Sequence, residues 1–168
     1  GNGKGKTTAA MGLVLRAAGN RMPVLVVQFI KGTWKTGEQE SIKALAPHVE
    51  MIRTGRGFTI DDLRDPKITQ EEHEQAAAEG FRLAREKLLS GRYKLVVLDE
   101  ILGAIRAELV SLEDVVDLIE RKPPDVHLVL TGRGAPPEIV ERADLVTEMT
   151  EIKHPYHQGI APQRGIEF

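Results

Sequence analysis

The chain opens with a glycine-rich run, Gly1–Thr8, which reads GNGKGKTT and leads directly into a stretch with helical spacing. Glycines let backbone N–H groups turn toward an anion, and the positive end of the following helix points at the same place. Such a turn normally joins a buried β-strand to a helix. We therefore expect an α/β fold whose first strand, an apolar segment just before Gly1, is missing from the given chain.

Short apolar runs alternate with segments of helical periodicity along the rest of the sequence. Continuous apolar runs of this length fit strands that are buried on both faces of a parallel sheet. We predict strands at 24–27, 49–53, 95–98, 126–130 and 144–149. We predict helices at 7–18, 37–46, 69–90, between the N-cap Ser111 and Pro123, and at 137–142.

This alternation predicts a mostly parallel sheet with helices on both faces, because sequential strands joined by helices pair in parallel. Together with the phosphate-binding loop, it indicates a three-layer, P-loop NTPase-like (RecA-like) architecture. We expect residues 1–168 to form a single nucleotide-binding domain. Residues 151–168 are rich in turn residues, and we expect them to form a loop at the active site or at a dimer edge.

The composition excludes several classes of protein. Cysteine is absent, which rules out disulfides, thiolate metal sites and a cysteine nucleophile. The 23 Lys and Arg against 25 Asp and Glu give a formal net charge of −2, so bulk charge provides no reason to expect a nucleic-acid partner. No apolar run approaches the roughly 18 residues of a membrane span, and we find no secretory signal. We therefore expect a cytoplasmic protein with no membrane partner.

The loop carries the residue types that bind a triphosphate with magnesium. Lys6 supplies a charge that reaches the outer phosphates, and the hydroxyl of Thr7 can coordinate Mg²⁺ (or Mn²⁺). Asp99 and Glu100 follow the apolar run 95–98, where an acidic side chain would complete a metal site, directly or through water. The structural alternatives are a glycine turn that binds nothing and, for Asp99 and Glu100, a solvated strand end or a helix N-cap. The predicted metal ligands are Thr7, Asp99 and Glu100, and the predicted nucleotide contacts within the loop are Asn2, Gly3, Lys4, Gly5, Lys6, Thr7 and Thr8.

Three further strings are more particular than the loop: Gln28–Gly32 (QFIKG), Thr131–Gly134 (TGRG) and Lys153–Pro155 (KHP). With the loop, they make nearly the whole chain resemble the P-loop type of corrinoid adenosyltransferase. The resemblance implies a cytoplasmic homodimer that binds ATP with Mg²⁺, in which a reduced Co(I) corrinoid attacks C5′ of the ribose and inorganic triphosphate leaves. Since cobalt is itself the nucleophile, the protein only has to position the triphosphate and absorb its charge, and Lys6 and Thr7 suit that catalytic role.

The resemblance also assigns residues outside the loop. It maps Arg16, Gln28, Lys31 and Arg133 near the nucleotide, and it implies an electron-donating flavoprotein as a further partner. It assigns Phe58 a catalytic role against the corrin, where an aromatic pair helps to remove the lower axial ligand of cobalt. The second member of that pair is usually tryptophan, but this chain has Ile60.

Another departure follows Glu100, where Ile101 and Leu102 stand in place of the usual polar residue and tyrosine. Both departures lie on the expected corrinoid side, whereas the nucleotide side is intact. Two other functions therefore stay open. A P-loop ATPase or kinase would use the same loop for γ-phosphate chemistry and would produce ADP. A relative that has lost corrinoid catalysis would bind ATP without forming an adenosylcorrinoid.

Overall fold

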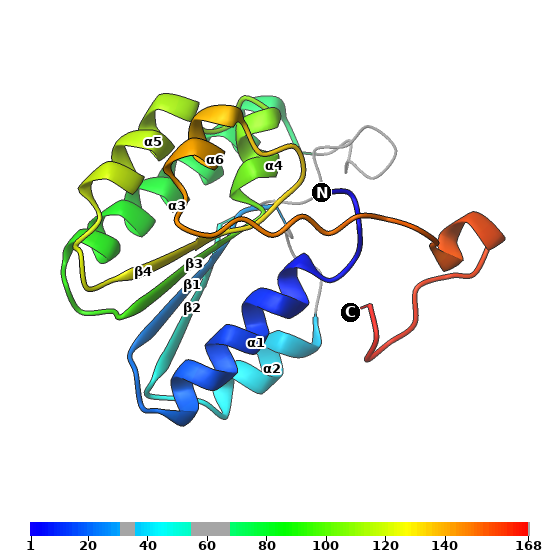
Figure 1. Cartoon of the computed structure of the whole chain (residues 1–168), viewed down its shortest axis with the longest axis horizontal. Coiled ribbons are helices and arrows are strands. Elements are labelled where there is room, and N and C mark those ends of the chain that lie inside the picture. Colours follow the sequence, from blue (N-terminus) through cyan, green and yellow to red (C-terminus); the bar gives the residue numbers. More distant parts are fainter. Residues whose placement is uncertain (31–35, 55–67, 168) are drawn as a thin grey trace.

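The computed structural model describes residues 1–30, 36–54 and 68–167 of the chain (Figure 1). The predictions for Lys31, Phe58 and Ile60 lie outside the described residues. Within them, the strands form one parallel sheet in the order β2-β1-β3-β4. The strands are β1 (Val24–Gln28), β2 (Val49–Arg53), β3 (Leu95–Asp99) and β4 (His127–Leu130).

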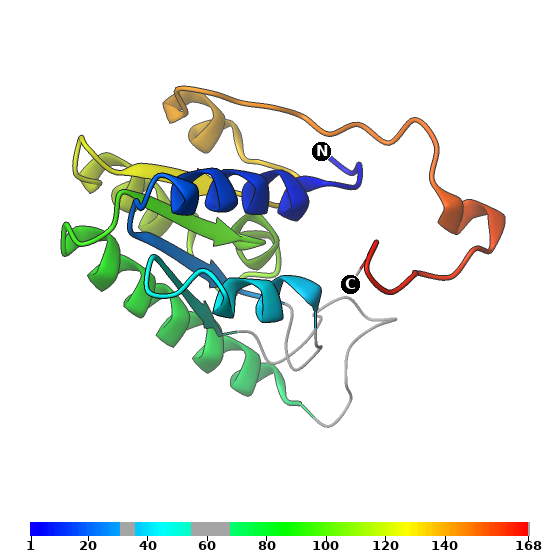
Figure 2. The ribbon, with the colours of Figure 1, turned by 90° about the horizontal axis from the view of Figure 1, so that it is seen from below.

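Helices cover both faces of this sheet (Figure 1; Figure 2). One face carries α1 (Lys6–Gly19) and α2 (Gly37–Lys43), and the other carries α3 (Gln70–Leu89), α4 (Ile101–Arg106), α5 (Leu112–Arg121) and α6 (Pro137–Arg142). Alternate residues of a strand point to opposite faces. Val26 accordingly packs with the helices on the first face, and Leu25 and Val27 pack with those on the second. The predicted parallel α/β sheet with helices on both faces is confirmed.

Local signals placed the ends of most elements correctly. Thr69 and Glu72 form the predicted capping box at the start of α3, with distances of 3.2 Å from Glu72 N to Thr69 Oγ1 and 2.9 Å from Thr69 N to Glu72 Oε2. Ser111 caps α5 by accepting a hydrogen bond from the N–H of Asp114 at 3.0 Å. The predicted end of α2 at residue 46 is wrong, because Ala46 precedes a proline and that position disfavours helical backbone.

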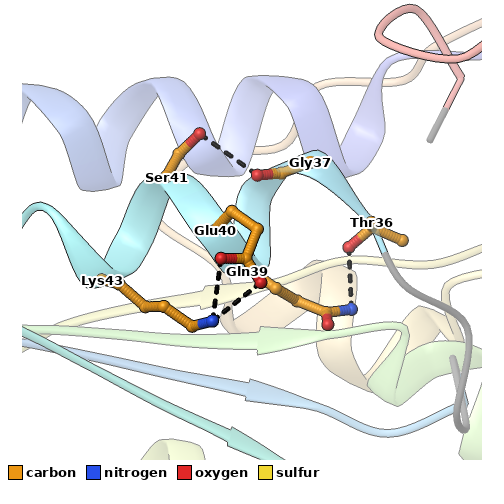
Figure 3. A network of polar contacts seen from close by, with 6 residues as sticks. All are labelled: Thr36, Gly37, Gln39, Glu40, Ser41 and Lys43. Carbon is orange, nitrogen blue, oxygen red and sulfur yellow. Dashed lines mark hydrogen bonds and ion pairs between the residues drawn. The ribbon is translucent and has the colours of Figure 1, made fainter.

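The short helix α2 is supported by contacts along its own surface (Figure 3). Lys43 Nζ lies 2.7 and 2.8 Å from the two carboxylate oxygens of Glu40, and Ser41 Oγ donates to the carbonyl of Gly37 at 3.1 Å. Exposed pairs of this kind contribute less than about 1 kcal/mol each. The apolar contribution of α2 to the core comes from the buried Ile42. No described helix combines the length and the apolar character that a membrane span requires.

The predicted strand at 144–149 is wrong. This segment joins the opening loop through a hydrogen bond from Gly3 N–H to Met149 C=O at 2.7 Å, and it forms no ladder with a described strand. A strand needs repeated backbone pairing with a neighbour, which local apolar pattern cannot supply. Its side chains are correspondingly exposed, with Leu145 at 85% and Val146 at 53%. The segment passes the amino end of α1 before the C-terminal tail curls beyond it (Figure 1; Figure 2).

Candidate functional site

Three buried polar side chains meet at the carboxyl edge of the sheet. Gln28 ends β1 and lies opposite Asp99, which ends β3, while Leu98 lies opposite Leu130 at the end of β4. Thr131, the next residue, therefore lies beside Asp99. The exposed fractions of Gln28, Asp99 and Thr131 are 1%, 0% and 8%. Ligands of open parallel sheets bind at this edge, and two of these three buried residues, Gln28 and Asp99, were predicted from sequence.

The glycine-rich loop presents the amino end of α1 to the same edge. Gly5 precedes the helix with a φ of 106°, a left-handed conformation that glycine adopts without a side-chain clash. Ala9 N–H makes the first helical bond, to Gly5 C=O at 2.8 Å. The N–H groups of residues 6–8 therefore precede the helical ladder and point out of the helix end. Aligned donors and the helix dipole form a preformed anion site.

Close packing against the segment 148–150 fixes the front of this loop. A Cβ added to Gly3 would lie 2.6 Å from the carbonyl oxygen of Met149, closer than real side chains come. Gly3 N–H donates to that same oxygen at 2.7 Å. Glycine at this position thus permits a backbone bond that a larger residue would break. Protein contacts therefore hold the front of the loop in this conformation without a ligand.

Among the described residues, the carboxylate of Asp99 accepts hydrogen bonds from three neutral donors. Oδ1 accepts from Thr131 Oγ1 at 2.8 Å and from Thr7 Oγ1 at 3.0 Å. Oδ2 accepts from Gln28 Nε2 at 3.0 Å. These bonds hold a fully buried carboxylate in one orientation and join the loop to the strand ends. The predicted neighbours Thr7 and Asp99 are in direct contact.

Glu100 has a backbone φ of 61°, an uncommon conformation for a residue with a side chain. Such a conformation costs roughly 1–3 kcal/mol and persists where neighbouring groups impose it. Its N–H donates to Thr131 Oγ1 at 2.9 Å. Glu100 Oε2 lies 3.2 Å from where a Cβ on Gly103 would stand, so the carboxylate lies over the first turn of α4.

Lys6 lies among the other charged groups of the site. Its Nζ donates to the carbonyl of Gly3 at 2.8 Å. Partial burial lowers the pKa of Lys6 below its usual 10.5; the carboxylate of Glu100 opposes this shift, and the charge of Arg133 adds to it. A partly desolvated ammonium gains from a new anionic partner. Lys6, Glu100 and Arg133 thus form one electrostatic unit at the mouth of the loop.

The oxygen donors suit magnesium that arrives with a ligand. Across residues 1–30, 36–54 and 68–167, no group of three or more His, Cys, Asp or Glu could hold a metal ion. Mg²⁺, however, usually binds through one or two protein oxygens, several waters and the phosphates of a nucleotide. Thr7 Oγ1 and Asp99 Oδ1, 3.0 Å apart, supply oxygens of the required type.

A hollow of ≈ 460 Å³ lies beside the loop and is lined by Asn2, Arg133, Glu148, Thr150 and Glu151. This volume falls within the range of small-molecule sites. Two of the lining residues, Asn2 and Arg133, belong to the predicted nucleotide contacts. The hollow thus extends the candidate site from the loop toward the segment after α6.

Other predicted residues lie further out. Arg16 is exposed on the last turn of α1, roughly 15 Å along the helix axis from Lys6. The exposed Lys4 forms an ion pair with Glu167, which brings the C-terminal tail to the loop. Sequence reasoning gave no role to Thr131. Its position directly after an apolar strand, in a string that carried the family resemblance, was the available signal.

The fold and this site define an α/β protein that presents an anion-binding helix end and a buried carboxylate at one edge of a parallel sheet. The comparisons with known proteins are more specific. The family model described as ATP:corrinoid adenosyltransferase BtuR/CobO/CobP matches residues 1–168, and the chain belongs to this family.

Similar proteins are named corrinoid adenosyltransferase, and this chain matches most of their length. A corrinoid adenosyltransferase from Sinorhizobium sp is 42% identical over 173 residues, covering 100% of this chain and 77% of the relative. One from Pseudomonas aeruginosa is 41% identical, covering 100% of this chain and 80% of the relative. One from Escherichia coli K12 is 39% identical, covering 100% of this chain and 82% of the relative.

Proposed function

We propose that this chain transfers the 5′-deoxyadenosyl group of ATP to the Co(I) centre of a reduced corrinoid. The electron pair of Co(I) forms the Co–C5′ bond while the C5′–O bond breaks, and that bonding pair leaves with inorganic triphosphate. Membership of the ATP:corrinoid adenosyltransferase family supports the reaction. Within the structure, the observation that supports it best is the contact of Thr7 with the buried Asp99 at 3.0 Å.

The loop would stabilise the leaving group. Breaking the C5′–O bond places new negative charge on the triphosphate, and donors already aimed at that position stabilise it without reorganising. The N–H groups of residues 6–8 would act in this way. On binding, Lys6 would exchange the carbonyl of Gly3, 2.8 Å away, for a phosphate oxygen.

Magnesium would be held by Thr7, with Asp99 and Glu100 acting on the ion through water. The ion would neutralise charge on the triphosphate oxygens and so make the triphosphate a better leaving group. Since the three donors to Asp99 keep its carboxylate in place, the protein would not need to rearrange to receive the ion. No protein nucleophile is required, because cobalt attacks carbon directly.

The remaining nucleotide contacts extend outward from the loop. Asn2 and Arg133 line the adjoining hollow, and Lys4 lies at the tail. Roles for Arg16 and Lys31 near the nucleotide, and for Phe58 against the corrin, rest on the family resemblance. We further propose a single-domain, cytoplasmic homodimer that receives electrons through a flavoprotein and whose tail, 151–168, covers the active site or a dimer edge.

The decisive experiment supplies ATP, Mg²⁺ and a chemically reduced corrinoid to the purified protein. Formation of an adenosylcorrinoid is followed by its visible spectrum, and the phosphate product is identified by ³¹P NMR. We expect one triphosphate per adenosylcorrinoid, and loss of both products in Lys6→Ala. Production of ADP without triphosphate would overturn the proposal in favour of an ATPase or kinase.

A further inference from the structure

Thr131 is a buried polar residue at the carboxyl edge to which neither the loop motif nor the family resemblance assigned a task. We infer that Thr131 is a positioning residue that sets both acidic groups of the site, Asp99 and Glu100, for the magnesium–triphosphate complex. The inference rests on the proposed function, since it concerns the same metal-dependent step. It is carried by the hydrogen bonds of one hydroxyl.

A threonine hydroxyl has one hydrogen to donate and two lone pairs that accept. Thr131 uses both capacities: Oγ1 donates to Asp99 Oδ1 at 2.8 Å and accepts from Glu100 N–H at 2.9 Å. The two acidic residues, which are neighbours in sequence, are therefore tied to one atom of the adjacent strand end. The side chain of Thr131 is buried, so water does not compete freely for these bonds.

The backbone of Thr131 holds the hydroxyl in place. Its N–H donates to Leu98 C=O at 3.1 Å, and its carbonyl accepts from Leu102 N–H at 3.2 Å. The next residue, Gly132, packs so closely against α4 that an added Cβ would lie 2.6 Å from Leu102 Cβ. The end of β4 is thus locked to the turn between β3 and α4 on both sides of Glu100.

Removing the hydroxyl has two separate consequences at the site. Of the two hydroxyls that donate to Asp99 Oδ1, Thr7 remains and Thr131 is lost, so the carboxylate can rotate away from the loop more easily. The N–H of Glu100 loses the acceptor that Thr131 provides. Because the φ of 61° at Glu100 is uncommon and is no longer supported by that bond, the turn tends to relax. Both changes misplace oxygens that would face the metal, whereas the loop donors at residues 6–8 are untouched.

This separation gives a specific test, in which ATP affinity is measured by calorimetry with and without Mg²⁺. Thr131→Val removes the hydroxyl at nearly constant volume, Thr131→Ser retains it, and Thr147→Val serves as a matched control at an exposed threonine. In Thr131→Val we expect the gain in ATP affinity on adding Mg²⁺ to shrink about tenfold, with metal-free ATP binding unchanged. Thr131→Ser and Thr147→Val should match the unmodified protein.

Two results would overturn the inference: an unchanged magnesium effect in Thr131→Val, or a loss in Thr131→Ser equal to that in Thr131→Val. If Thr131→Val does not fold, Thr131→Ala takes its place, and thermal melting confirms that the variants compared are folded. Because the hydroxyl acts through Asp99 as well as Glu100, the effect of Thr131→Val should be smaller in an Asp99→Asn background than in the unmodified protein. Binding is measured without corrinoid, so a failure of the proposed transfer reaction is recognised separately, by the unmodified protein forming no adenosylcorrinoid.

Discussion

Replacing Asp99 by asparagine would remove the buried charge while nearly preserving shape. The fold can accommodate this change because of Gln28. In the present arrangement Gln28 Nε2 donates to Asp99 Oδ2, and the buried Gln28 Oε1 has no hydrogen-bond partner within the described part of the chain. Rotation of the Gln28 amide would present Oε1 to the side-chain amide that Asp99→Asn introduces. We therefore expect a stability change of no more than about 1–2 kcal/mol.

The effect on magnesium should be much larger than the effect on folding. A carboxylate that acts on a divalent ion through one water lies about 4 Å from it, and even at the dielectric constant of water the interaction is about 2 kcal/mol. Loss of that interaction corresponds to a drop of about thirtyfold in magnesium-dependent ATP affinity. The true drop should be larger, because Asp99 is fully buried and the effective dielectric constant there is lower.

Calorimetric titration of ATP at several Mg²⁺ concentrations measures this drop, and thermal unfolding of the same samples measures stability. Metal-free ATP binding provides the internal control, because the loop donors remain. An Asp99→Asn variant with a normal melting temperature and undiminished magnesium dependence would refute the assignment of Asp99. A variant that simply unfolds would contradict the role given to Gln28.

Three further outcomes are expected. Gly3→Ala should lower stability by about 1–3 kcal/mol and weaken ATP binding, since its Cβ would lie 2.6 Å from the Met149 carbonyl oxygen; normal melting and binding would contradict the bracing of the loop. Glu167→Gln frees Lys4 from an exposed ion pair, so ATP affinity should rise by no more than about threefold, less so in high salt; a loss of affinity would show that the tail assists binding. The charged form of Lys6 binds phosphate, and burial lowers the pKa of Lys6 below 10.5. ATP affinity should therefore fall as pH rises, and the fall should begin at a lower pH than for an ordinary lysine. Lys6→Arg should flatten this decline.

Local sequence predicted those parts of the fold that depend on local physics. The runs 24–27 and 95–98 are apolar without alternation because their strands are buried on both faces. The segment 144–149 contains Leu145, Val146 and Met149 among polar residues, but a strand also requires a pairing neighbour, and that is a property of the tertiary arrangement. The helix α4 was missed because its 6 residues are mostly apolar, contain Gly103 and show no amphipathic period. The equally short α6 was predicted, and it begins with a proline at its first position.

The same distinction applies to the candidate site. Lys6 and Thr7 lie in a contiguous motif, and Asp99 stands at a strand end, so sequence pattern brought attention to them. Thr131 contacts Asp99 only because β3 and β4 are adjacent and in a particular register. No local pattern encodes that register, and the contribution of Thr131 became visible only with the side chains in place.

In the proposed reaction, the loop holds the triphosphate as a leaving group while the bond to C5′ breaks. ATP labelled with ¹⁸O at the oxygen that bridges C5′ and the α-phosphorus tests it directly. After reaction with the reduced corrinoid, mass spectrometry should find the label in inorganic triphosphate and none in the adenosylcorrinoid. Label found instead in ADP, AMP or another 5′-oxygenated nucleoside product, with no labelled triphosphate, would contradict the account.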